Sequence, residues 1–470
     1  MVSLKRLAGI LREPVLRETR ANLARSRDRL APHLHSDRQM LGRQGNGCGA
    51  TIGAMPRCDF ACRGCYLGDD ANRIPAATVD EIKAQMRTLR PTLGNAGNLQ
   101  LTDGEITLRP DAEVVELLRY ARELGLVPML MTHGDSFRRR PGLLERYMVE
   151  GGLSEVSIHV DTTQRGRKGA EWRAPNGEAA LNPLRDEFAA LVRRAKAETG
   201  LPLRCATTMT VTRDNLAGVA DVMAWLRNNT DVFRLISFQP IAQVGRTEDG
   251  LGGGVPVDAL WDEVARGLSM EPGRKGQLAR GEQWLGHARC NRFVHGLVAR
   301  REGALGAFLP VRMEGDGVGA RVVDEFLARF GGVTFRRDSA LEALARMLAL
   351  AARAPGFLLR HVPPYLVHWA RRFDPGHPVR AARDLLTGRL RIESLVIVSH
   401  HFMSSQELET PLGRERLSHC VFHVAIDGEL VSMCEANAAG RRDAYYDRLR
   451  RRDPAAGDAA PAGDEMLSLS

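Results

Sequence analysis

Short apolar segments alternate with longer amphipathic segments between residues 50 and 245, and this alternation limits the chain to few folds. The apolar runs predict strands, and the segments between them have the periodicity of helices. The predicted strands span 51–55, 98–102, 127–132, 155–160, 203–211 and 233–239, and the predicted helices span 79–90, 111–124, 141–150, 182–199 and 215–228. Six such repeats predict an α/β fold whose parallel sheet curves into a partial (β/α)6, TIM-like barrel. In such barrels the chemistry lies at the carboxyl ends of the strands.

The chain of 470 residues is longer than one ordinary domain, and its composition changes on both sides of the predicted barrel. We expect a polar helical extension, a connector with a helical region, a small α+β module and a disordered tail; these cover 1–49, 246–390, 391–450 and 451–470. Segment 340–373 is strongly apolar with arginines along one side. It suits the interface of a membrane, or, as the more frequent alternative, a buried pair of core helices.

Three cysteines lie close together in the segment PRCDFACRGCYLG, at Cys58, Cys62 and Cys65. The C-x3-C-x2-C spacing allows one loop to wrap three thiolates around a face of a cubane cluster and to leave the fourth iron open. Thiolates are the soft ligands that iron–sulfur clusters require. The alternatives are a zinc site and chance clustering, but the paired C-x2-C units or histidines of a zinc knuckle are absent here. The spacing therefore favours a [4Fe–4S] cluster.

The triplet follows the first predicted strand and precedes the strand–helix repeats, and in this it resembles the radical SAM superfamily over about residues 50–245. The resemblance implies that the open iron chelates S-adenosylmethionine. It also implies reductive cleavage to a 5′-deoxyadenosyl radical, which abstracts a hydrogen atom. The family usually has an aromatic residue just before the third cysteine. Here Gly64 occupies that place and Tyr66 follows, so we expect Tyr66 to be the aromatic residue near the cofactor.

Asp103, Gly104 and Glu105 follow the second predicted strand, where the family has a Gly-Gly-Glu motif that holds the methionine amino group. The carboxylate of Glu105 can accept hydrogen bonds from an ammonium group, and Gly104 lets the backbone approach a ligand. An ordinary Asp-Gly turn is the alternative. Together with the cysteine triplet, the motif predicts a cofactor contact.

Polar residues also mark the ends of the later strands. Thr132 occupies the place of a Thr-Asn-Gly motif in the family. His159 and Asp161 alternate with aliphatic residues, so both are predicted to point into the barrel, although a hydrogen-bonded structural histidine is the usual alternative. Thr208 and Gln239 are polar positions in otherwise apolar strands, which suits side chains that face a cofactor.

Three later cysteines are candidates for a second site. Cys420 and Cys434 bracket a predicted hairpin, and Cys290 lies in the segment GHARCNRF. The hairpin resembles the first half of the auxiliary-cluster modules that follow some radical SAM barrels. A second [4Fe–4S] cluster would take Cys48, a histidine or substrate as its fourth ligand; the alternative is a pair of buried cysteines.

The sequence does not identify the substrate. The cysteine pattern loosely resembles the tetraether-lipid-synthase branch, which implies a lipid substrate. Modification of a peptide or small molecule, as in branches with auxiliary clusters, is the second hypothesis. The third is a non-catalytic iron–sulfur electron carrier.

The net charge and the search for targeting signals limit the expected partners and location of the protein. The 66 basic and 57 acidic residues give a net charge of +9, but the arginines are scattered, so no nucleic acid is expected. No apolar run is long enough for a signal peptide or a membrane span, which predicts a cytoplasmic enzyme. We expect a flavodoxin or ferredoxin as reductant, and peripheral contact with the inner membrane face through 340–373.

Overall fold

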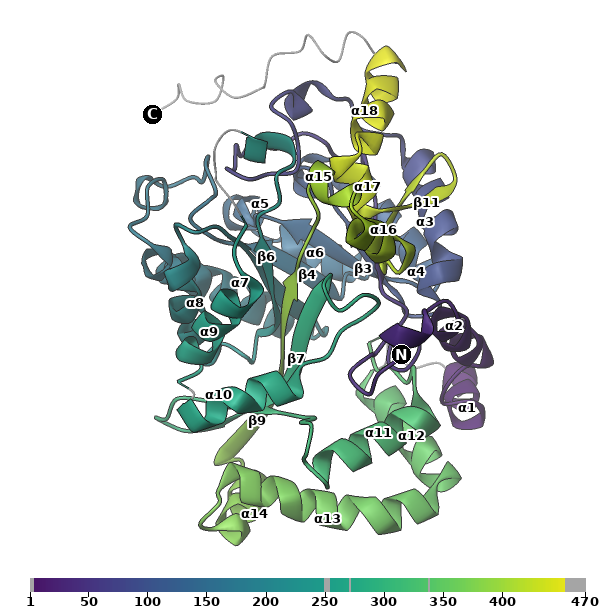
Figure 1. The fold of residues 1–470 in the computed structure, drawn as a ribbon, viewed down its shortest axis with the longest axis vertical. Coiled ribbons are helices and arrows are strands. Elements are labelled where there is room, and N and C mark those ends of the chain that lie inside the picture. Colours follow the sequence, from purple (N-terminus) through teal and green to yellow (C-terminus); the bar gives the residue numbers. More distant parts are fainter. Residues whose placement is uncertain (1–3, 249–253, 270–271, 337–338, 453–470) are drawn as a thin grey trace.

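The computed structural model describes residues 4–248, 254–269, 272–336 and 339–452 (Figure 1). These residues form one curled sheet of eleven strands in the order β11-β10-β1-β2-β3-β4-β5-β6-β9-β7-β8. All neighbours from β10 to β9 pair in parallel, whereas β10–β11, β9–β7 and β7–β8 pair antiparallel. The predicted α/β fold with a partial barrel is confirmed.

The six strands of the predicted barrel lie next to one another in chain order. They are β1 (Cys48–Ala50), β2 (Asn98–Leu101), β3 (Val127–Thr132), β4 (Glu155–His159), β5 (Arg204–Val211) and β6 (Phe233–Pro240). The first strand is shorter and earlier than the predicted 51–55. Gly53 has a positive φ of 75° and donates its backbone N–H to the side chain of Asp103, so the chain has already left the sheet there.

Helices cover the outer face of these strands. They are α3 (Val79–Leu93), α4 (Asp111–Glu123), α5 (Asp135–Arg139), α6 (Leu143–Val149), α7 (Asn182–Thr199) and α8 (Val219–Leu226). Helix α3 begins with a capping box in which Thr78 and Glu81 bond each other's backbone N–H groups. Its side chains Ile82, Met86 and Leu89 are fully buried, and burial of each such side chain stabilises the fold by about 1.5–3 kcal/mol.

The C-terminal part of the chain completes the sheet on both sides. Strands β9 (Leu390–His400), β7 (Asn291–Arg301) and β8 (Ala307–Pro310) extend it beyond β6, while β10 (Phe422–Ile426) and β11 (Glu429–Ser432) extend it beyond β1. The expected module 391–450 therefore has no sheet of its own: β9 pairs with β6, and β10 pairs with β1. Short helices α15 (Ser405–Leu408), α16 (Pro411–Ser418), α17 (Met433–Ala438) and α18 (Arg441–Arg452) follow these strands.

A separate group of helices lies below the sheet in Figure 1. It comprises α11 (Gly319–Phe330), α12 (Ala340–Arg353), α13 (Pro355–Phe373) and α14 (Pro378–Leu386), and α12 also contacts the N-terminal α1 (Leu4–Arg12). The remaining helices are α2 (Arg17–Asp28), α9 (Val257–Gly267) and α10 (Pro272–Gly281). Leu359 and Leu366 on α13 are 80% and 63% exposed, so 340–373 is not a buried pair of core helices.

Candidate functional site

The loop that carries the cysteine triplet is fastened to the end of β2. Gly104 donates its N–H to the carbonyl of Met55 (2.7 Å), and Glu105 donates to the carbonyl of Arg57 (2.8 Å). A Cβ atom on Gly104 would lie 2.3 Å from the carbonyl oxygen of Arg57 and 2.4 Å from that of Pro56. Only glycine allows this approach, so Gly104 sets the distance between the cysteine loop and the sheet.

The same loop is fastened on its other side to the segment after β4. Ala61 and Arg63 donate backbone N–H groups to the carbonyls of Arg165 and Thr163, each at 2.9 Å. The cysteine loop is thus held by backbone bonds between the ends of two strands. This places it over the carboxyl ends of the barrel strands.

The three thiols of this loop are half-buried. Burial, with smaller contributions from the neighbouring Cys65 and Asp161, raises the pKa of Cys62 to about 12. Burial, Glu105 and the other two thiols likewise raise the pKa of Cys58. Thiols with raised pKa values stay protonated on their own. A metal centre binds the deprotonated form, and its positive charge offsets the repulsion between neighbouring thiolates. The donor set therefore fits a cluster.

The spacing of the thiols also favours a cluster over one metal ion. Sulfurs bound to a single zinc ion lie within about 4.6 Å of each other, twice the usual Zn–S length. In the described part of the chain, the one group of three or more His, Cys, Asp and Glu residues whose ligand atoms lie within 4.8 Å of each other is Cys58, Asp59 and His133. The three sulfurs are therefore spread more widely than one ion allows.

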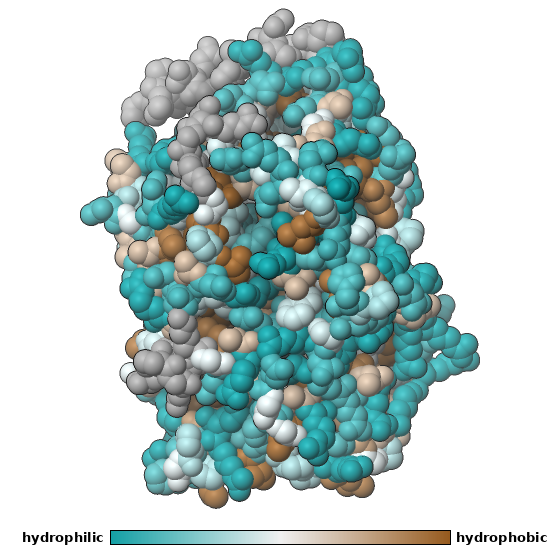
Figure 2. All heavy atoms as spheres, in the orientation of Figure 1, coloured by the Kyte–Doolittle hydropathy of each residue, from teal (hydrophilic) through white to brown (hydrophobic). Residues whose placement is uncertain are grey.

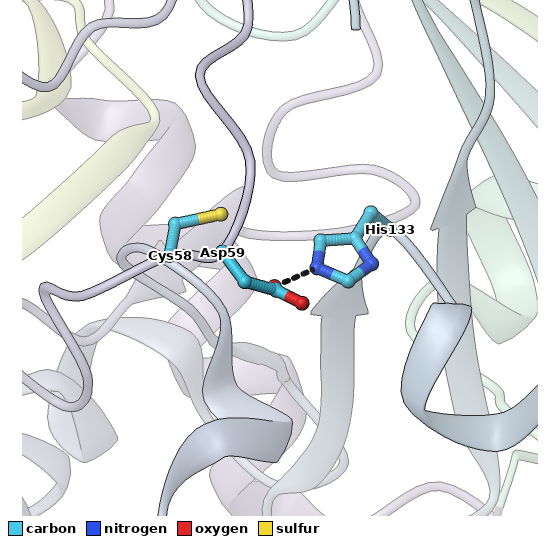
Figure 3. A group of neighbouring side chains, drawn as sticks. All are labelled: Cys58, Asp59 and His133. Carbon is cyan, nitrogen blue, oxygen red and sulfur yellow. Dashed lines mark hydrogen bonds and ion pairs between the residues drawn. The ribbon is translucent and has the colours of Figure 1, made fainter. Parts of the chain in front are cut away.

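Figure 3 shows the group of Cys58, Asp59 and His133, in which Asp59 and His133 meet beside the thiol of Cys58. The Nδ1 atom of His133 accepts a backbone hydrogen bond from Asp135, so Nε2 carries a proton and donates it to Asp59 (2.8 Å). The ring of His133 stacks on Phe60 with centroids 3.8 Å apart. Burial alone would lower the pKa of His133, but Glu105 and Asp59 raise it above the usual value.

Glu105 is 1% exposed, and its two carboxylate oxygens are used unequally. Oε1 accepts hydrogen bonds from the backbone and hydroxyl of Thr107 (3.1 and 2.6 Å) and from the hydroxyl of Thr132 (2.7 Å). Oε2 accepts one from the backbone of His133 (2.9 Å), with the ring Nε2 of the same residue at 3.3 Å. A carboxylate has about four acceptor positions. Oε2 therefore keeps more capacity for a further donor than Oε1.

Asp103 and Tyr66 have partners within the protein that the sequence did not reveal. The carboxylate of Asp103 forms an ion pair with Arg442 and accepts hydrogen bonds from Tyr446 and from Gly53. The ring of Tyr66 lies 4.6 Å below the guanidinium of Arg442, and its hydroxyl donates to the backbone carbonyl of Asp103 (3.3 Å). Both side chains join the cysteine loop to α18.

His159 and Asp161 meet at the end of β4. Asp161 is 2% exposed and accepts hydrogen bonds from His159, from the backbone and hydroxyl of Thr163 (2.8 and 2.6 Å) and from the backbone of Thr210 (2.6 Å). Arg167 joins this end to that of β3, since it donates to the carbonyls of both His133 and His159 at 3.1 Å. The polar residues after β2, β3 and β4 thus lie in a connected network beside the thiols.

Thr208 and Gln239 lie on the wall of a cavity of about 490 Å³ inside the barrel. The hydroxyl of Thr208 is 3.0 Å from that of Ser157 on the next strand. Apolar side chains share the wall; they include Met129, Met131, Leu235, Phe293, Val396, Val398, Phe402 and Phe422. Cys48, Cys290, Cys420 and Cys434 line the same cavity.

The family model described as the radical SAM superfamily matches residues 52–226, the segment that carries the cysteine loop and its anchoring strand ends. Residues 52–226 are a radical SAM domain. The superfamily is one of enzymes, and membership implies a [4Fe–4S] cluster and S-adenosylmethionine. In this radical SAM domain Cys58, Cys62 and Cys65 offer the donors that fit such a cluster.

One curated relative and several solved structures are similar to parts of the chain. The 7,8-dihydro-6-hydroxymethylpterin dimethyltransferase of Methanocaldococcus jannaschii is 24% identical over 202 residues, 43% of this chain and 37% of the relative. SuiB of Streptococcus suis with bound S-adenosylmethionine is 14% identical, with a TM-score of 0.31 over 42% of this chain and 41% of that one. The structure of anSMEcpe with bound AdoMet is 13% identical, with a TM-score of 0.31 over 41% and 50%.

Sequence reasoning did not identify Asp59 or Phe60 as parts of the site, and it did not predict the partners that Arg167 has in the structure. Asp59 and Phe60 stand between two cysteines, where the spacing of the thiols is the only visible signal. Arg167 has its ring contact with Phe60 (5.0 Å) and its carbonyl partners on other strands. Periodicity along one segment carries no information about such partners.

Proposed function

We propose that this protein cleaves S-adenosylmethionine reductively and abstracts hydrogen from an apolar substrate, with a lipid chain as the favoured class. Cys58, Cys62 and Cys65 would hold the cluster. When bound, the cluster supplies the electron that breaks a C–S bond of S-adenosylmethionine and yields the 5′-deoxyadenosyl radical. Membership of an enzyme superfamily and the convergent thiols support this reaction over a non-catalytic electron carrier.

Glu105 is the residue that we assign to the methionine ammonium group. Three donors hold Oε1 in place, whereas Oε2 keeps capacity for a charged donor. A hydrogen bond from an ammonium to this buried carboxylate would be charge-assisted and strong. An electron carrier has no need of a carboxylate held in this way, which is a further argument for a cofactor pocket.

The lipid class rests on the wall of the barrel cavity. Met129 and Met131 of β3 and Leu235 of β6 line it, together with apolar residues of β9 and β7. Burial of the apolar surface of a ligand against this wall is favourable by about 25 cal/mol for each Å² removed from water. Polar groups such as Thr208 and Gln239 on the same wall would orient the end of a chain.

Helices α12–α14 provide the contact that a lipid substrate requires, and we propose that they lie on the membrane surface. Large apolar side chains are exposed there, among them Leu359 (80%), Val379 (82%) and Leu386 (88%). Arg360 and Arg371 are exposed on α13, and Arg389 is exposed between α14 and β9. Figure 2 shows apolar residues along the lower edge, where Figure 1 places α13 and α14. No helix of the described residues is long and apolar enough to cross a bilayer, so the contact would be interfacial.

The second candidate is chemistry on a small molecule, and one observation favours it. The curated relative is named for methylating a dihydropterin, although the match spans 37% of that protein. Modification of a peptide is a further candidate from the sequence. Neither class makes use of the exposed leucines of α13 and α14, so we rank both below a lipid.

Transfer of deuterium into 5′-deoxyadenosine distinguishes these substrates. The reconstituted, reduced protein would be incubated with S-adenosylmethionine and either perdeuterated-acyl phospholipid vesicles or a deuterated dihydropterin. We expect 5′-deoxyadenosine one mass unit heavier with the vesicles alone. Deuterium transfer from the pterin, without transfer from the lipid, would contradict the lipid assignment and leave the cleavage reaction intact. Cleavage of S-adenosylmethionine requires only the cluster at Cys58, Cys62 and Cys65, so this test does not depend on the other cysteines.

A further inference from the structure

Four cysteines that are far apart in the sequence line one cavity. Cys48 begins β1, Cys290 precedes β7, Cys420 precedes β10 and Cys434 lies in the first turn of α17. Cys48, Cys290 and Cys420 are half-buried and Cys434 is buried. They come from both arms of the curled sheet, since β1 and β10 lie on one arm and β7 on the other.

Backbone contacts tie the four positions together. Cys48 donates its N–H to the carbonyl of Val421, next to Cys420, at 2.9 Å. On the other arm, the carbonyl of Cys290 accepts the N–H of His401 (2.9 Å). Two residues later, the N–H of Met403 points at the sulfur of Cys434 (3.5 Å). The segment after β9 therefore links Cys290 to Cys434 across the open side of the barrel.

Three of the four sulfurs accept hydrogen bonds from N–H groups. The donors are Met403 to Cys434 (3.5 Å), Phe422 to Cys420 (3.4 Å) and the guanidinium Nε of Arg416 to Cys290 (3.5 Å). Hydrogen bonds to the ligating sulfurs are one of the means by which proteins tune iron–sulfur clusters. In the cysteine triplet, Phe60 makes the same bond to Cys58 (3.4 Å) that Phe422 makes to Cys420, each from two residues further along.

The charges of these thiols also interact. Burial raises the pKa of Cys420, and Cys434, Cys290 and Cys48 raise it further, against one backbone hydrogen bond that lowers it. Burial raises the pKa of Cys48 to about 12 and that of Cys434 to about 11. Four such thiols stay protonated until a metal centre takes up their negative charge, which couples metal binding to proton release.

Cys205 shows what an ordinary buried cysteine looks like in this fold. It lies within β5, is 1% exposed and stands outside the residues that line the cavity. Its sulfur donates to the carbonyl of the next residue (3.4 Å). Cys48, Cys290, Cys420 and Cys434 instead line an open cavity, which packing alone does not require.

The spacing of the four sulfurs decides between a single ion and a cluster. One zinc ion would need its sulfurs within about 4.6 Å of each other. No three of these four are that close, because the described residues contain a single group within 4.8 Å and it lies elsewhere, at Cys58. A multi-iron cluster separates its ligand sulfurs more widely and suits the cavity.

We propose that Cys48, Cys290, Cys420 and Cys434 bind a second [4Fe–4S] cluster with protein ligands on all four irons. With no open iron, this cluster does not chelate S-adenosylmethionine. It joins the two arms of the sheet and closes the open side of the barrel. The proposal rests on the cysteines alone, and the cluster would occupy the part of the cavity that they line.

Metal analysis of full-length variants tests the proposal without measuring activity. The triple variant Cys58→Ala, Cys62→Ala, Cys65→Ala, reconstituted anaerobically, should keep about four irons and four sulfides per chain, and the unsubstituted protein about eight of each. Adding Cys420→Ala or Cys48→Ala should remove at least about three quarters of the iron that the triple variant keeps. Adding Cys205→Ala, the matched control, should leave the iron content unchanged.

Three results would overturn the proposal. They are a triple variant without iron whose circular dichroism matches the parent, zinc without sulfide in place of iron, and full retention of iron after Cys48→Ala or Cys420→Ala. Where the triple variant fails to fold, the unsubstituted protein decides the question. Mössbauer spectra of about eight irons per chain support a second cluster, and about four irons contradict it.

Discussion

Asp103 and Arg442 form a buried ion pair that joins the end of β2 to α18, although 339 residues separate them in the sequence. Their side chains are 0% and 3% exposed. Burial alone would lower the pKa of Arg442, but the charge of Asp103 raises it well above the usual value. Because Asp103 precedes Gly104 and Glu105, this pair fixes the strand end that carries the cysteine loop.

Replacement of Arg442 by Met should therefore destabilise the fold strongly. The change leaves the Asp103 carboxylate buried without its cation, and breaking such a pair costs about 3–5 kcal/mol. Urea unfolding of the metal-free protein measures the free energy of unfolding. Arg450→Met on the same helix is the control, since Arg450 pairs with Asp70 and Asp447 at the surface, where a pair contributes about 0–1 kcal/mol. Equal losses in the two variants would contradict the anchoring role of Asp103.

Replacement of Glu105 by Gln should weaken the binding of S-adenosylmethionine. A hydrogen bond to a charged group contributes about 1.5–3 kcal/mol, so the dissociation constant should rise about ten- to a hundred-fold. Equilibrium dialysis with the cluster-loaded protein measures it. Glu116→Gln, at a half-exposed glutamate that pairs with Lys83, is the control. An unchanged affinity in Glu105→Gln with full iron content would remove Glu105 from the cofactor pocket.

Replacement of Asp161 by Asn should reduce stability at neutral pH, and the difference should shrink in acid. Burial alone would raise the pKa of Asp161, but His159, Thr163 and Thr210 lower it below 3.8. A carboxylate with a lowered pKa stabilises the fold above its unfolded pKa and loses this effect as pH falls through the folded value.

We expect the metal-free Asp161→Asn variant to be less stable than the parent by about 1.5–3 kcal/mol at pH 7. The difference should begin to narrow below about pH 4. Thermal unfolding across this range measures it, with the exposed Asp258→Asn as the control. A difference that stays constant from pH 7 to pH 3 would show that the ionised form of Asp161 contributes nothing.

Replacement of three leucines on α13 and α14 should release the protein from membranes. In Leu359→Ser, Leu366→Ser, Leu386→Ser, the apolar surface available for insertion is removed, and binding to anionic vesicles should weaken at least about tenfold. Flotation with phosphatidylglycerol vesicles measures the bound fraction. Leu305→Ser, at a 64% exposed leucine between β7 and β8, is the control. Unchanged flotation of the triple variant, or no flotation of the parent, would contradict the membrane contact.

Periodicity predicted the barrel strands well because each is a local pattern. Five of the six predicted strands, from β2 to β6, begin and end within one residue of their predicted bounds. β1 was misplaced because its boundary depends on the turn at Gly53 and on Asp103. The places of β7, β9 and β10 depend on pairing with strands far away along the chain, which no local pattern encodes.

The candidate site also combines features that a local pattern encodes with features that depend on distant parts of the chain. The thiols and Glu105 stand in short motifs, so sequence reasoning could find them. The ion pair of Asp103 and the ring stack of Phe60 on His133 depend on side chains brought together from several strands and from α18. The contact between the ring of Tyr66 and Arg442 is a further example, because the two residues lie far apart in the sequence.

Formation of 5′-deoxyadenosine is the most direct test of the central claim. The anaerobically reconstituted protein, reduced with dithionite and supplied with S-adenosylmethionine, should produce 5′-deoxyadenosine and methionine in equal amounts. The triple variant Cys58→Ala, Cys62→Ala, Cys65→Ala should produce none, even if it retains other iron. Absence of 5′-deoxyadenosine from the iron-loaded parent, or its formation by the triple variant, would contradict reductive cleavage at these three cysteines.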